Sequence, residues 1–318
     1  MRIGVLTSGG DAPGMNAAIR AVTRKAIYHG LEVVGIQRGF WGLLNESYRE
    51  LKLGSVADII QRGGTLLQTS RSEEFKTPEG QQKALEFLQK IGVTGLVVIG
   101  GDGSFKGAQA LYEQGLNTVG VPGTIDNDIW GSERTIGFDT AVNTVTDAIN
   151  KLRDTATAHE RIYVVEVMGR HSGAIALMAG LAGGAETILL PEVPLDYEAV
   201  CSKLQRGIAR GKRHSILLVA EGVASGAEVA ENIRCILNME VRVTVLGHLQ
   251  RGGTPTAFDR VLASTMGAEA VDVLRRGEGG KVVVWQHGGP RVLDFSETEG
   301  QPIPFQKHLY ELAKILSI

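Results

Sequence analysis

The feature that most constrains the fold is a series of short apolar runs, each of which ends abruptly at glycine or at a polar residue. Ile3–Leu6 leads into Gly9-Gly10, and Leu96–Ile99 leads into Gly100-Gly101. Apolar runs of this length without alternation are typical of parallel strands that are buried on both faces. The same pattern predicts further strands at Val119–Val121, Tyr163–Val167, Ile216–Ala220 and Val241–Leu246.

Segments compatible with helices follow three of these runs, at Met15–Ile27, Phe105–Tyr112 and Gly173–Leu181. Alternating strands and helices predict βαβ units and a doubly wound sheet. The chain has 318 residues, more than one compact core usually accommodates. We therefore expect two doubly wound α/β lobes with mainly parallel sheets. The first comprises residues 1–137 with 251–304 returning to it, and the second comprises 138–250 with 305–318.

Charge and cysteine content narrow the class of protein. The formal net charge of -2 gives no general attraction to nucleic acid or to an anionic membrane. Two cysteines, Cys201 and Cys235, cannot build a disulfide framework, which indicates a reducing compartment. No apolar stretch reaches the ~20 residues that a membrane-spanning helix needs. We expect a soluble cytoplasmic protein.

Two glycine loops follow predicted strands and precede predicted helices. Gly100–Ser104 follows Leu96–Ile99, and Gly9-Gly10-Asp11 follows Ile3–Leu6. Glycines let backbone N–H groups approach phosphate oxygens, and a helix N-terminus favours negative charge. Asp102 in such a loop is suited to hold Mg²⁺. Each loop alone could be only a tight turn, but two at strand ends favour phosphate binding. Neither loop is a Walker A sequence, and neither has the spacing of the dinucleotide fingerprint.

A third loop, Pro122–Asp128, carries two carboxylates directly after a predicted strand. In an extended segment Asp126 and Asp128 would project to the same side, and each would raise the proton affinity of the other. That arrangement is one way to build a general base, and Thr124 could donate a hydrogen bond to a phosphate. Read alone, the loop is equally explained as a turn rich in Asp and Asn. Together with the glycine loops, catalysis is the better interpretation.

In this order, the three loops resemble those of the bacterial ATP-dependent 6-phosphofructokinases. Three later segments strengthen the resemblance, which covers about residues 1–268: Met168-Gly169-Arg170, Ala220-Glu221-Gly222 and Gly247–Gly253. The resemblance implies a glycolytic kinase that uses Mg²⁺ and transfers the γ-phosphoryl group of ATP to the 1-hydroxyl of fructose 6-phosphate, forming fructose 1,6-bisphosphate and ADP. It also implies that the active site lies at the carboxyl ends of the strands, between the lobes.

The resemblance assigns roles to residues that match the family's motifs. Asp126 is implied as the base that deprotonates the sugar hydroxyl, Asp102 as the Mg²⁺ ligand, and Arg71 and Arg170 as the groups that neutralise the transferred phosphoryl. Thr124 and Asp128 complete the catalytic set. The implied ATP-binding residues are Gly10, Arg71, Ser72, Gly101, Asp102, Gly103 and Ser104. The implied sugar-binding residues are Thr124, Ile125, Asp126, Arg161, Met168, Gly169, Arg170, Glu221, Arg242, His248 and Arg251.

The resemblance further implies assembly and regulation. In the family, the residues matching Arg161 and Arg242 reach over from a neighbouring subunit, so the working unit is a homotetramer. A basic effector cleft between subunits, which takes ADP as activator and phosphoenolpyruvate as inhibitor, is matched by Arg20, Arg24, Arg153, Glu186, Arg210, Lys212, Arg213 and His214. Basic side chains on a helix face are more often simply solvated, and that alternative stays open.

Gly103 and Gly123 bear on the phosphoryl donor. Pyrophosphate-using relatives carry an aspartate and a lysine at these places, which fill the space of the nucleotide. Two glycines are expected to leave that space open, so ATP is preferred over pyrophosphate. The alternatives are a pyrophosphate-dependent phosphofructokinase and a non-catalytic nucleotide sensor. A dehydrogenase is disfavoured because the N-terminal loop lacks the spaced glycines.

Overall fold

The computed structural model describes residues 1–298 and 303–317. The chain divides into two compact units, Met1–Thr140 with Arg251–Ile303, and Ala141–Gln250 with Pro304–Ile318. The predicted lobes share the boundary after residue 250 with these units. The predicted first crossover lies three residues earlier, after 137, and the predicted last one lies one residue later, after 304.

Within the described residues, the first unit is built on an eight-stranded sheet in the order β12-β11-β5-β4-β1-β2-β3, with β6 paired to β5. The strands β11, β5, β4, β1 and β2 are parallel, whereas β3 and β12 run antiparallel at the two edges. The strand bounds are β1 (Arg2–Thr7), β2 (Glu32–Ile36), β3 (Tyr48–Glu50), β4 (Gly95–Gly100), β5 (Asn117–Thr124), β6 (Ile136–Gly137), β11 (Lys281–Gln286) and β12 (Gly289–Asp294).

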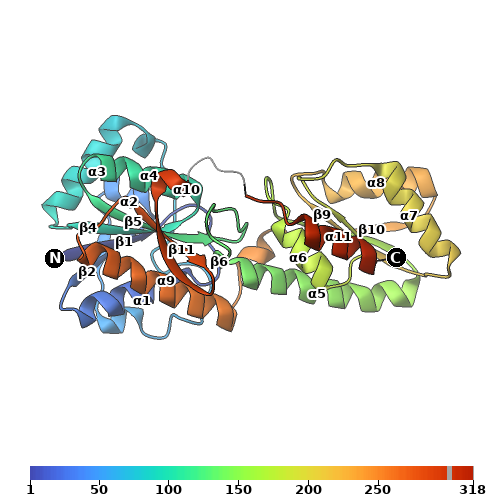
Figure 1. Ribbon diagram of the computed structural model, residues 1–318, viewed down its shortest axis with the longest axis horizontal. Coiled ribbons are helices and arrows are strands. Elements are labelled where there is room, and N and C mark those ends of the chain that lie inside the picture. The colour runs from blue at the N-terminus through green and yellow to red at the C-terminus, as the bar shows by residue number, and fades with distance from the viewer. Residues whose placement is uncertain (299–302, 318) are drawn as a thin grey trace. The chain divides into compact units, whose positions relative to one another are not determined.

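Helices cover both faces of this sheet (Figure 1). On one face α3 and α4 pack their apolar side chains against β4 and β2 in a single core, and on the other α1 packs along α9. The bounds are α1 (Met15–Tyr28), α2 (Phe40–Leu44), α3 (Pro78–Lys90), α4 (Asp102–Glu113), α9 (Ala257–Arg275) and α10 (Phe295–Thr298), with short 3₁₀ turns η1 (Leu53–Val56) and η2 (Glu74–Lys76).

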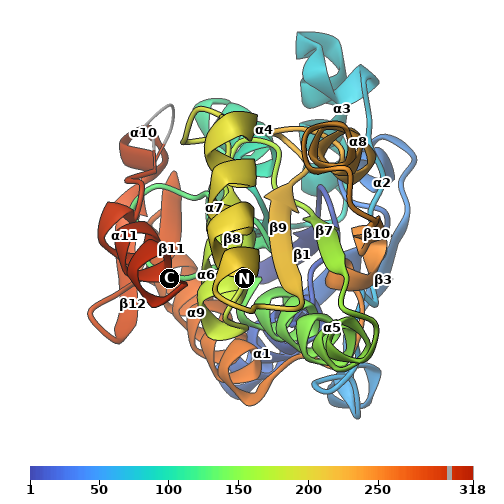
Figure 2. The same cartoon turned by 90° about the vertical axis from the view of Figure 1, so that its right-hand side faces the viewer.

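The second unit has a parallel four-stranded sheet in the order β10-β7-β9-β8 within the described part of the chain. Apolar side chains of α7 and α8 form a core with one face of β7, β9 and β10, and α6 packs against β8 and β9 (Figure 2). The bounds are β7 (Ile162–Val167), β8 (Thr187–Leu189), β9 (Ser215–Ala220), β10 (Val241–Val245), α5 (Phe138–His159), α6 (Ala174–Ala182), α7 (Tyr197–Ala209), α8 (Gly226–Leu237), α11 (Lys307–Leu316) and a 3₁₀ turn η3 (Gly247–Arg251).

The predicted fold class, α/β with mainly parallel sheets, is confirmed. One predicted strand end is wrong: the run Val119–Val121 does not stop at Pro122-Gly123, because β5 continues to Thr124. Pro122 falls in the gap between the pairing of β5 with β11, which includes Gly120, and its pairing with β6, which begins at Gly123. A residue without an N–H is tolerated at such a gap in the ladder.

The order of the strands fixes where a ligand is expected. From β1 the chain moves to β2 on one side, and it returns to β4 and β5 on the other side. Ligands of open α/β sheets bind beyond the carboxyl ends of the strands at such a reversal, which here lies between β1 and β4. Among the described residues, no helix combines the length and the apolar character that a membrane crossing requires.

Candidate active site

The loops that follow β1, β4 and β5 line one cavity of about 680 Å³ in the first unit. This volume lies within the ~300–1,000 Å³ typical of small-molecule and cofactor sites. The predicted residues that the cavity brings together are Gly10, Arg71, Ser72, Gly101, Asp102, Gly103, Ser104, Thr124, Asp126, Asp128 and Arg251.

The two glycine loops meet closely at the ends of β1 and β4. The N–H of Ser8 donates to the carbonyl of Ile99 at 2.9 Å. A Cβ at Gly100 would lie 2.5 Å from Ser104 Oγ and 2.6 Å from the carbonyl oxygen of Ser8. No side chain fits at such distances, so glycine is required at position 100 for the two loops to approach each other.

The second glycine loop opens α4, and Asp102 is the first residue of that helix. The helix start presents backbone N–H groups and a positive partial charge to the cavity, which suits a phosphate. The Asp102 carboxylate is about half exposed and pairs with Lys106 Nζ at 3.0 Å, one turn along the helix. In the described part of the chain, no three His, Cys, Asp or Glu side chains gather closely enough to hold a metal ion by themselves.

The carboxylate loop turns sharply after β5. Asn127 adopts a left-handed backbone conformation, with φ of 50°, so of the two alternatives for residues 126–128 the structure shows the turn and not the extended segment. Its side chain fixes the turn: Oδ1 accepts from the N–H of Thr135 at 2.9 Å, and Nδ2 donates to the carbonyl of Glu133 at 3.3 Å. The Thr135 hydroxyl in turn donates to the carbonyl of Thr124 at 2.6 Å. Asp126 is partly buried and Asp128 is exposed, so the two carboxylates have different surroundings.

Thr124 and Ile125 differ in what they can offer a substrate. The Thr124 hydroxyl accepts a hydrogen bond from the N–H of Asp126 at 3.2 Å, which leaves its own proton available for donation. The side chain of Ile125 is fully buried. Ile125, which the resemblance places among the sugar-binding residues, does not line the cavity.

The segment that carries Arg71 and Ser72 is tied to the end of β1 by side-chain hydrogen bonds. The Thr7 hydroxyl donates to the carbonyl of Gln68 at 2.9 Å, and the Thr69 hydroxyl donates to the carbonyl of Gly9 at 2.8 Å. Farther along, buried Asn16 of α1 accepts from the N–H of Leu66 at 2.7 Å. These bonds bring the segment to the cavity without a regular secondary structure of its own.

Arg251 lies against the first glycine loop. Its guanidinium fills the place that a Cβ on Gly10 would take, with Nη1 only 2.4 Å from that position, and Nη1 donates to the carbonyl of Asp11 at 3.2 Å. The resemblance assigns Arg251 to the 6-phosphate of the sugar. Within the first unit its guanidinium lines the same cavity as the glycine loops.

Four other predicted sugar-binding residues gather at the carboxyl ends of β7 and β9 in the second unit. The N–H of Glu221 donates to the carbonyl of Val167 at 2.8 Å, and Arg170 Nε lies 3.6 Å from the Glu221 carboxylate. Gly169 has a φ of 132°, and a Cβ there would lie 2.3 Å from the carbonyl oxygen of Ser172. Met168 donates its N–H to the side chain of Gln250, two residues after exposed His248.

Arg161 and Arg242 lie at the opposite edge of the same sheet. Arg161 precedes β7, and Arg242 stands near the start of β10 with Tyr163 as its neighbour across the ladder. Both arginines pair with Glu240, Arg161 at 3.1 Å. At ~3.3 Å per residue, β7 separates Arg161 from Met168 by roughly 20 Å. Within one chain, the two arginines and the Met168–Glu221 group cannot reach the same small ligand.

A family model described as Phosphofructokinase matches residues 2–274. The chain belongs to the phosphofructokinase family. It is 60% identical over 317 residues to the ATP-dependent 6-phosphofructokinase of Shouchella clausii and 59% identical to that of Bacillus subtilis, in each case with 100% of this chain and 99% of the relative covered. Its fold is similar to that of phosphofructokinase from Saccharomyces cerevisiae, with a TM-score of 0.88 and 34% identity. That match covers 99% of this chain and 46% of the yeast chain.

The predicted effector residues of this family member are brought together only in part. In the second unit, the Glu186 carboxylate pairs with Lys212 at 2.8 Å and with Arg153 at 3.7 Å. Arg213 pairs instead with Glu160, and His214 lies 3.5 Å from the Thr157 hydroxyl. The remaining members lie elsewhere: Arg210 follows the end of α7, and Arg20 and Arg24 lie on α1 of the first unit.

The two glycines used to predict the donor differ in their surroundings. A Cβ at Gly103 would meet nothing within 4 Å, which agrees with open space at that position. A Cβ at Gly123 would lie 3.0 Å from Ile99 and 3.1 Å from Met15. Gly123 nevertheless lines the cavity, as Gly103 does, and the packing of Ile99 and Met15 leaves little room for a side chain at position 123.

Several residues of the cavity wall, among them Phe40, Phe75, Lys106 and Gly107, were not predicted from the sequence. Phe40 of α2 and Phe75 of η2 stack at 4.2 Å between ring centroids, and Gly107 leaves room for both rings. No local pattern marks these residues, since they come from separate segments. Lys106 had a signal, because its spacing of four residues from Asp102 predicts an ion pair on a helix.

Proposed function

We propose that this chain is an ATP-dependent 6-phosphofructokinase, which transfers the γ-phosphoryl group of ATP to the 1-hydroxyl of fructose 6-phosphate in cytoplasmic glycolysis. One observation carries the proposal: the glycine loops after β1 and β4 and the carboxylates after β5 line one cavity. The identity of 60% to an enzyme named for this reaction supports the choice of substrates.

Different residues of the first unit are proposed to carry out different parts of the phosphoryl transfer. Phosphoryl transfer needs positioning and charge neutralisation more than covalent catalysis. The Gly10 loop and the start of α4 bind the nucleotide phosphates through backbone N–H groups, and Arg71 neutralises the transferred group. Asp126 accepts the proton of the sugar hydroxyl, and Thr124 donates to a phosphate oxygen. Asp128 and Arg251 add charge at the same cavity.

Asp102 is the residue proposed to hold Mg²⁺. The donor set fits this ion, because Mg²⁺ commonly takes one or two carboxylates and completes its shell with water and substrate phosphates. When bound, Mg²⁺ neutralises charge on the phosphates of the nucleotide. The Asp102 carboxylate would hold the Mg²⁺ charge at the start of α4, and the same carboxylate pairs with Lys106.

The second unit is proposed to bind the sugar through Met168, Gly169, Arg170 and Glu221, with His248. Because Arg161 and Arg242 stand at the opposite edge of their sheet, we infer that they serve the sugar 6-phosphate in a neighbouring subunit of a homotetramer. The pairing of Lys212 and Arg153 with Glu186 supports an effector site for ADP and phosphoenolpyruvate, to which Arg20, Arg24, Arg210, Arg213 and His214 are proposed to contribute.

The deciding experiment measures phosphorylation of fructose 6-phosphate with ATP or with pyrophosphate, each with and without Mg²⁺. We expect turnover with ATP and Mg²⁺ and a loss of turnover when Mg²⁺ is chelated. Turnover with pyrophosphate in place of ATP would overturn the choice of donor. If the protein binds ATP but shows no turnover with either donor, the result would favour the nucleotide sensor.

A negative charge placed at position 103 should weaken ATP binding without changing the stability of the fold. Gly103→Asp puts a carboxylate into open space at the start of α4, where it repels the phosphates of ATP. We expect KM for ATP to rise about tenfold or more and the melting temperature to change little. Steady-state kinetics and thermal unfolding test this. Gly103→Ala is the control and should leave KM nearly unchanged; an equal rise in both variants would contradict the electrostatic explanation.

Removal of the Arg242 side chain should weaken the binding of fructose 6-phosphate but not the binding of ATP. A hydrogen bond to a charged group contributes ~1.5–3 kcal/mol, so we expect Arg242→Ala to raise KM for fructose 6-phosphate about 10- to 100-fold. KM for ATP should stay within about threefold. Arg276, which pairs with Glu269 and Glu278 in the first unit, provides the control Arg276→Ala, which should leave both KM values unchanged. Equal effects of Arg242→Ala on both KM values would remove Arg242 from the phosphate site.

A further inference from the structure

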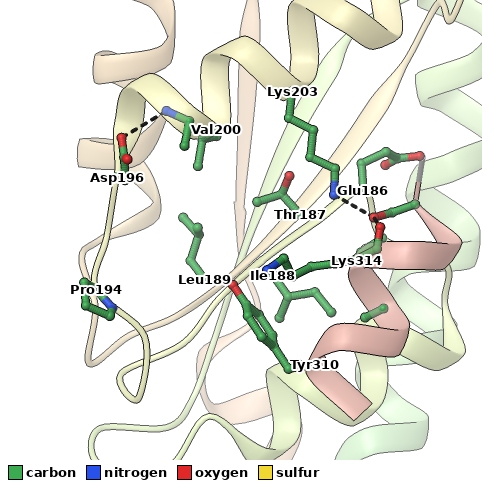
Figure 3. A pocket seen from close by; sticks show the side chains of 14 residues that line it. Glu186, Thr187, Ile188, Leu189, Pro194, Asp196, Val200, Lys203, Tyr310 and Lys314 are labelled. Atoms are coloured by element: carbon green, nitrogen blue, oxygen red, sulfur yellow. Dashed lines mark hydrogen bonds between the residues drawn. The ribbon is translucent and has the colours of Figure 1, made fainter. Parts of the chain in front are cut away.

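A second cavity, of about 240 Å³, lies in the second unit along β8, the strand at the edge of its sheet. Its walls come from β8, the first turns of α7 and one side of α11 (Figure 3). None of the residues proposed above for catalysis or sugar binding lines it. Glu186 is the one residue that it has in common with the proposed effector set.

The size of the cavity limits what can bind there. The cavity volume is about 240 Å³. It is smaller than the ~300–1,000 Å³ of sites for drug-sized ligands. The volume therefore favours a small metabolite over a nucleotide.

Lys203 of α7 gives the cavity a cation that lacks a carboxylate partner within the described residues. Its ammonium donates to Ser317 Oγ at 2.6 Å, and no Asp or Glu of the described chain lies within ion-pair distance of it. Burial lowers the pKa of Lys203, and Lys212, Lys314 and Arg206 add to that effect, while Glu186 opposes it. A partly buried ammonium among like charges favours an incoming anion.

The hydroxyl of Thr187 is a second polar group that points to a ligand in this cavity. Its Oγ1 is buried, and among the described residues it has no hydrogen-bond partner. Thr187 lies on β8 in the cavity wall, on the same side as Lys203 in Figure 3. Buried hydroxyls are almost always hydrogen-bonded, and a rotation of the Thr187 side chain toward the cavity would let a ligand oxygen complete this group.

The acidic side chains of the cavity wall, Glu186 and Asp196, already have hydrogen-bond or ion-pair partners within the chain. One oxygen of Glu186 pairs with Lys212, and the other accepts a hydrogen bond from the N–H of Ile216. Asp196 caps the start of α7 by accepting from the N–H of Ala199 at 3.0 Å, and Figure 3 shows it at the opposite end of the cavity from Lys203. The space between is apolar, with side chains of Ile188, Leu189, Pro194 and Val200.

We propose that this cavity binds a small organic carboxylate, whose charged end contacts Lys203 and Thr187 and whose short apolar body packs against Ile188 and Leu189 of β8. The site is separate from the nucleotide cavity of the first unit. It is also distinct from the cluster of Arg153 and Lys212, which approaches Glu186 through other contacts. The proposal does not depend on the proposed reaction, because it is tested by binding alone.

The test uses isovalerate, a small branched carboxylate, and its neutral counterpart isovaleramide. Methyl NMR of the full-length protein follows the signals of Ile188 and Leu189 during titration. We expect both signals to shift with isovalerate and to stay in place with isovaleramide. Lys203→Met and Thr187→Val should each weaken isovalerate binding, by at least tenfold for Lys203→Met. Native methyl spectra of the unliganded variants show that they are folded.

Two further variants separate this site from other basic surfaces. Lys151→Met removes an exposed lysine of α5 that pairs with Asp147, and it should leave isovalerate binding unchanged. Lys212→Met probes the neighbouring effector cluster. If Lys212→Met abolishes binding and Lys203→Met does not, the anion binds at that cluster and the proposal is wrong. The absence of any isovalerate-dependent shift at Ile188 and Leu189 in the native protein would also overturn it.

Discussion

Asp126→Asn should reduce kcat by ~10²–10⁴-fold, the usual cost of losing a general base, while the affinity for ATP stays nearly the same. Asparagine keeps the size and shape of the side chain but cannot accept the proton of the sugar hydroxyl. The turn that positions residue 126 is fixed by Asn127 and Thr135, so the backbone should survive the change. Steady-state kinetics with fructose 6-phosphate and a separate measurement of ATP binding test this.

Asp128→Asn is the matched control. Asp128 lines the same cavity two residues away but is exposed, whereas Asp126 is partly buried. We expect the Asp128 variant to retain far more activity than the Asp126 variant. If the two variants lose activity equally, the carboxylates act as a pair. If Asp126→Asn keeps full turnover, Asp126 is not the base.

The strands β1, β4, β5, β7, β9 and β10 could be predicted because burial on both faces leaves a clear pattern, whereas the parallel strands β2, β6 and β11 were not predicted. The runs at Ile3–Leu6, Leu96–Ile99 and Ile216–Ala220 are wholly apolar, and β1, β4 and β9 contain them. The edge strands β3 and β8 were not predicted. Each has only three residues, which is too short for a period to show.

The loops of the candidate site could be predicted because their chemistry is contained in contiguous residues. Contacts between distant segments could not. Phe40 and Phe75 stack although 34 residues separate them, and nothing local links them. The turn at Asn127 was one of two alternatives for its loop, but the hydrogen bonds with Glu133 and Thr135 that fix it could not be predicted. The crowding of Gly123 by Ile99 and Met15 also follows only from the packed structure.

The crossover from β6 into α5 depends on one buried carboxylate that no motif marks. Asp259 of α9 is fully buried and accepts hydrogen bonds from the N–H of Gly137 at 3.0 Å and from the N–H of Thr140 at 2.8 Å. The Thr140 hydroxyl donates to the same carboxylate at 2.5 Å, and it accepts from the N–H of Thr256. A side chain of α9 thereby holds the start of α5 in place.

Asp259→Ala should lower the free energy of unfolding by about 3–5 kcal/mol, because it leaves several buried donors without an acceptor. Burial raises the pKa of Asp259 to about 6, against the opposing effect of hydrogen bonds from Thr140 and Gly137. Since this pKa exceeds the value of 3.8 for an unperturbed Asp, the folded state binds the proton more tightly than the unfolded chain. The contribution of Asp259 is therefore complete below about pH 4 and is lost as the pH rises through 6.

Urea unfolding at pH 5 and at pH 7.5 tests both parts of this prediction. Asp259→Ala should cost less at pH 7.5, by on the order of 1–3 kcal/mol. Asp259→Asn, which resembles the protonated carboxyl, should remove this pH dependence.

Asp272 on the same helix is the control. Burial raises its pKa, but hydrogen bonds and charges from Lys25 and Arg275 outweigh burial and lower it overall. Its own contribution is lost only as the pH falls below the usual Asp range. His29 Nε2 lies 3.9 Å from the Asp272 carboxylate, so the control is made in a His29→Asn background, in which Asp272→Asn should cost the same at both pH values. An equal pH response in the Asp259 and Asp272 variants would show that Asp259 does not titrate as proposed.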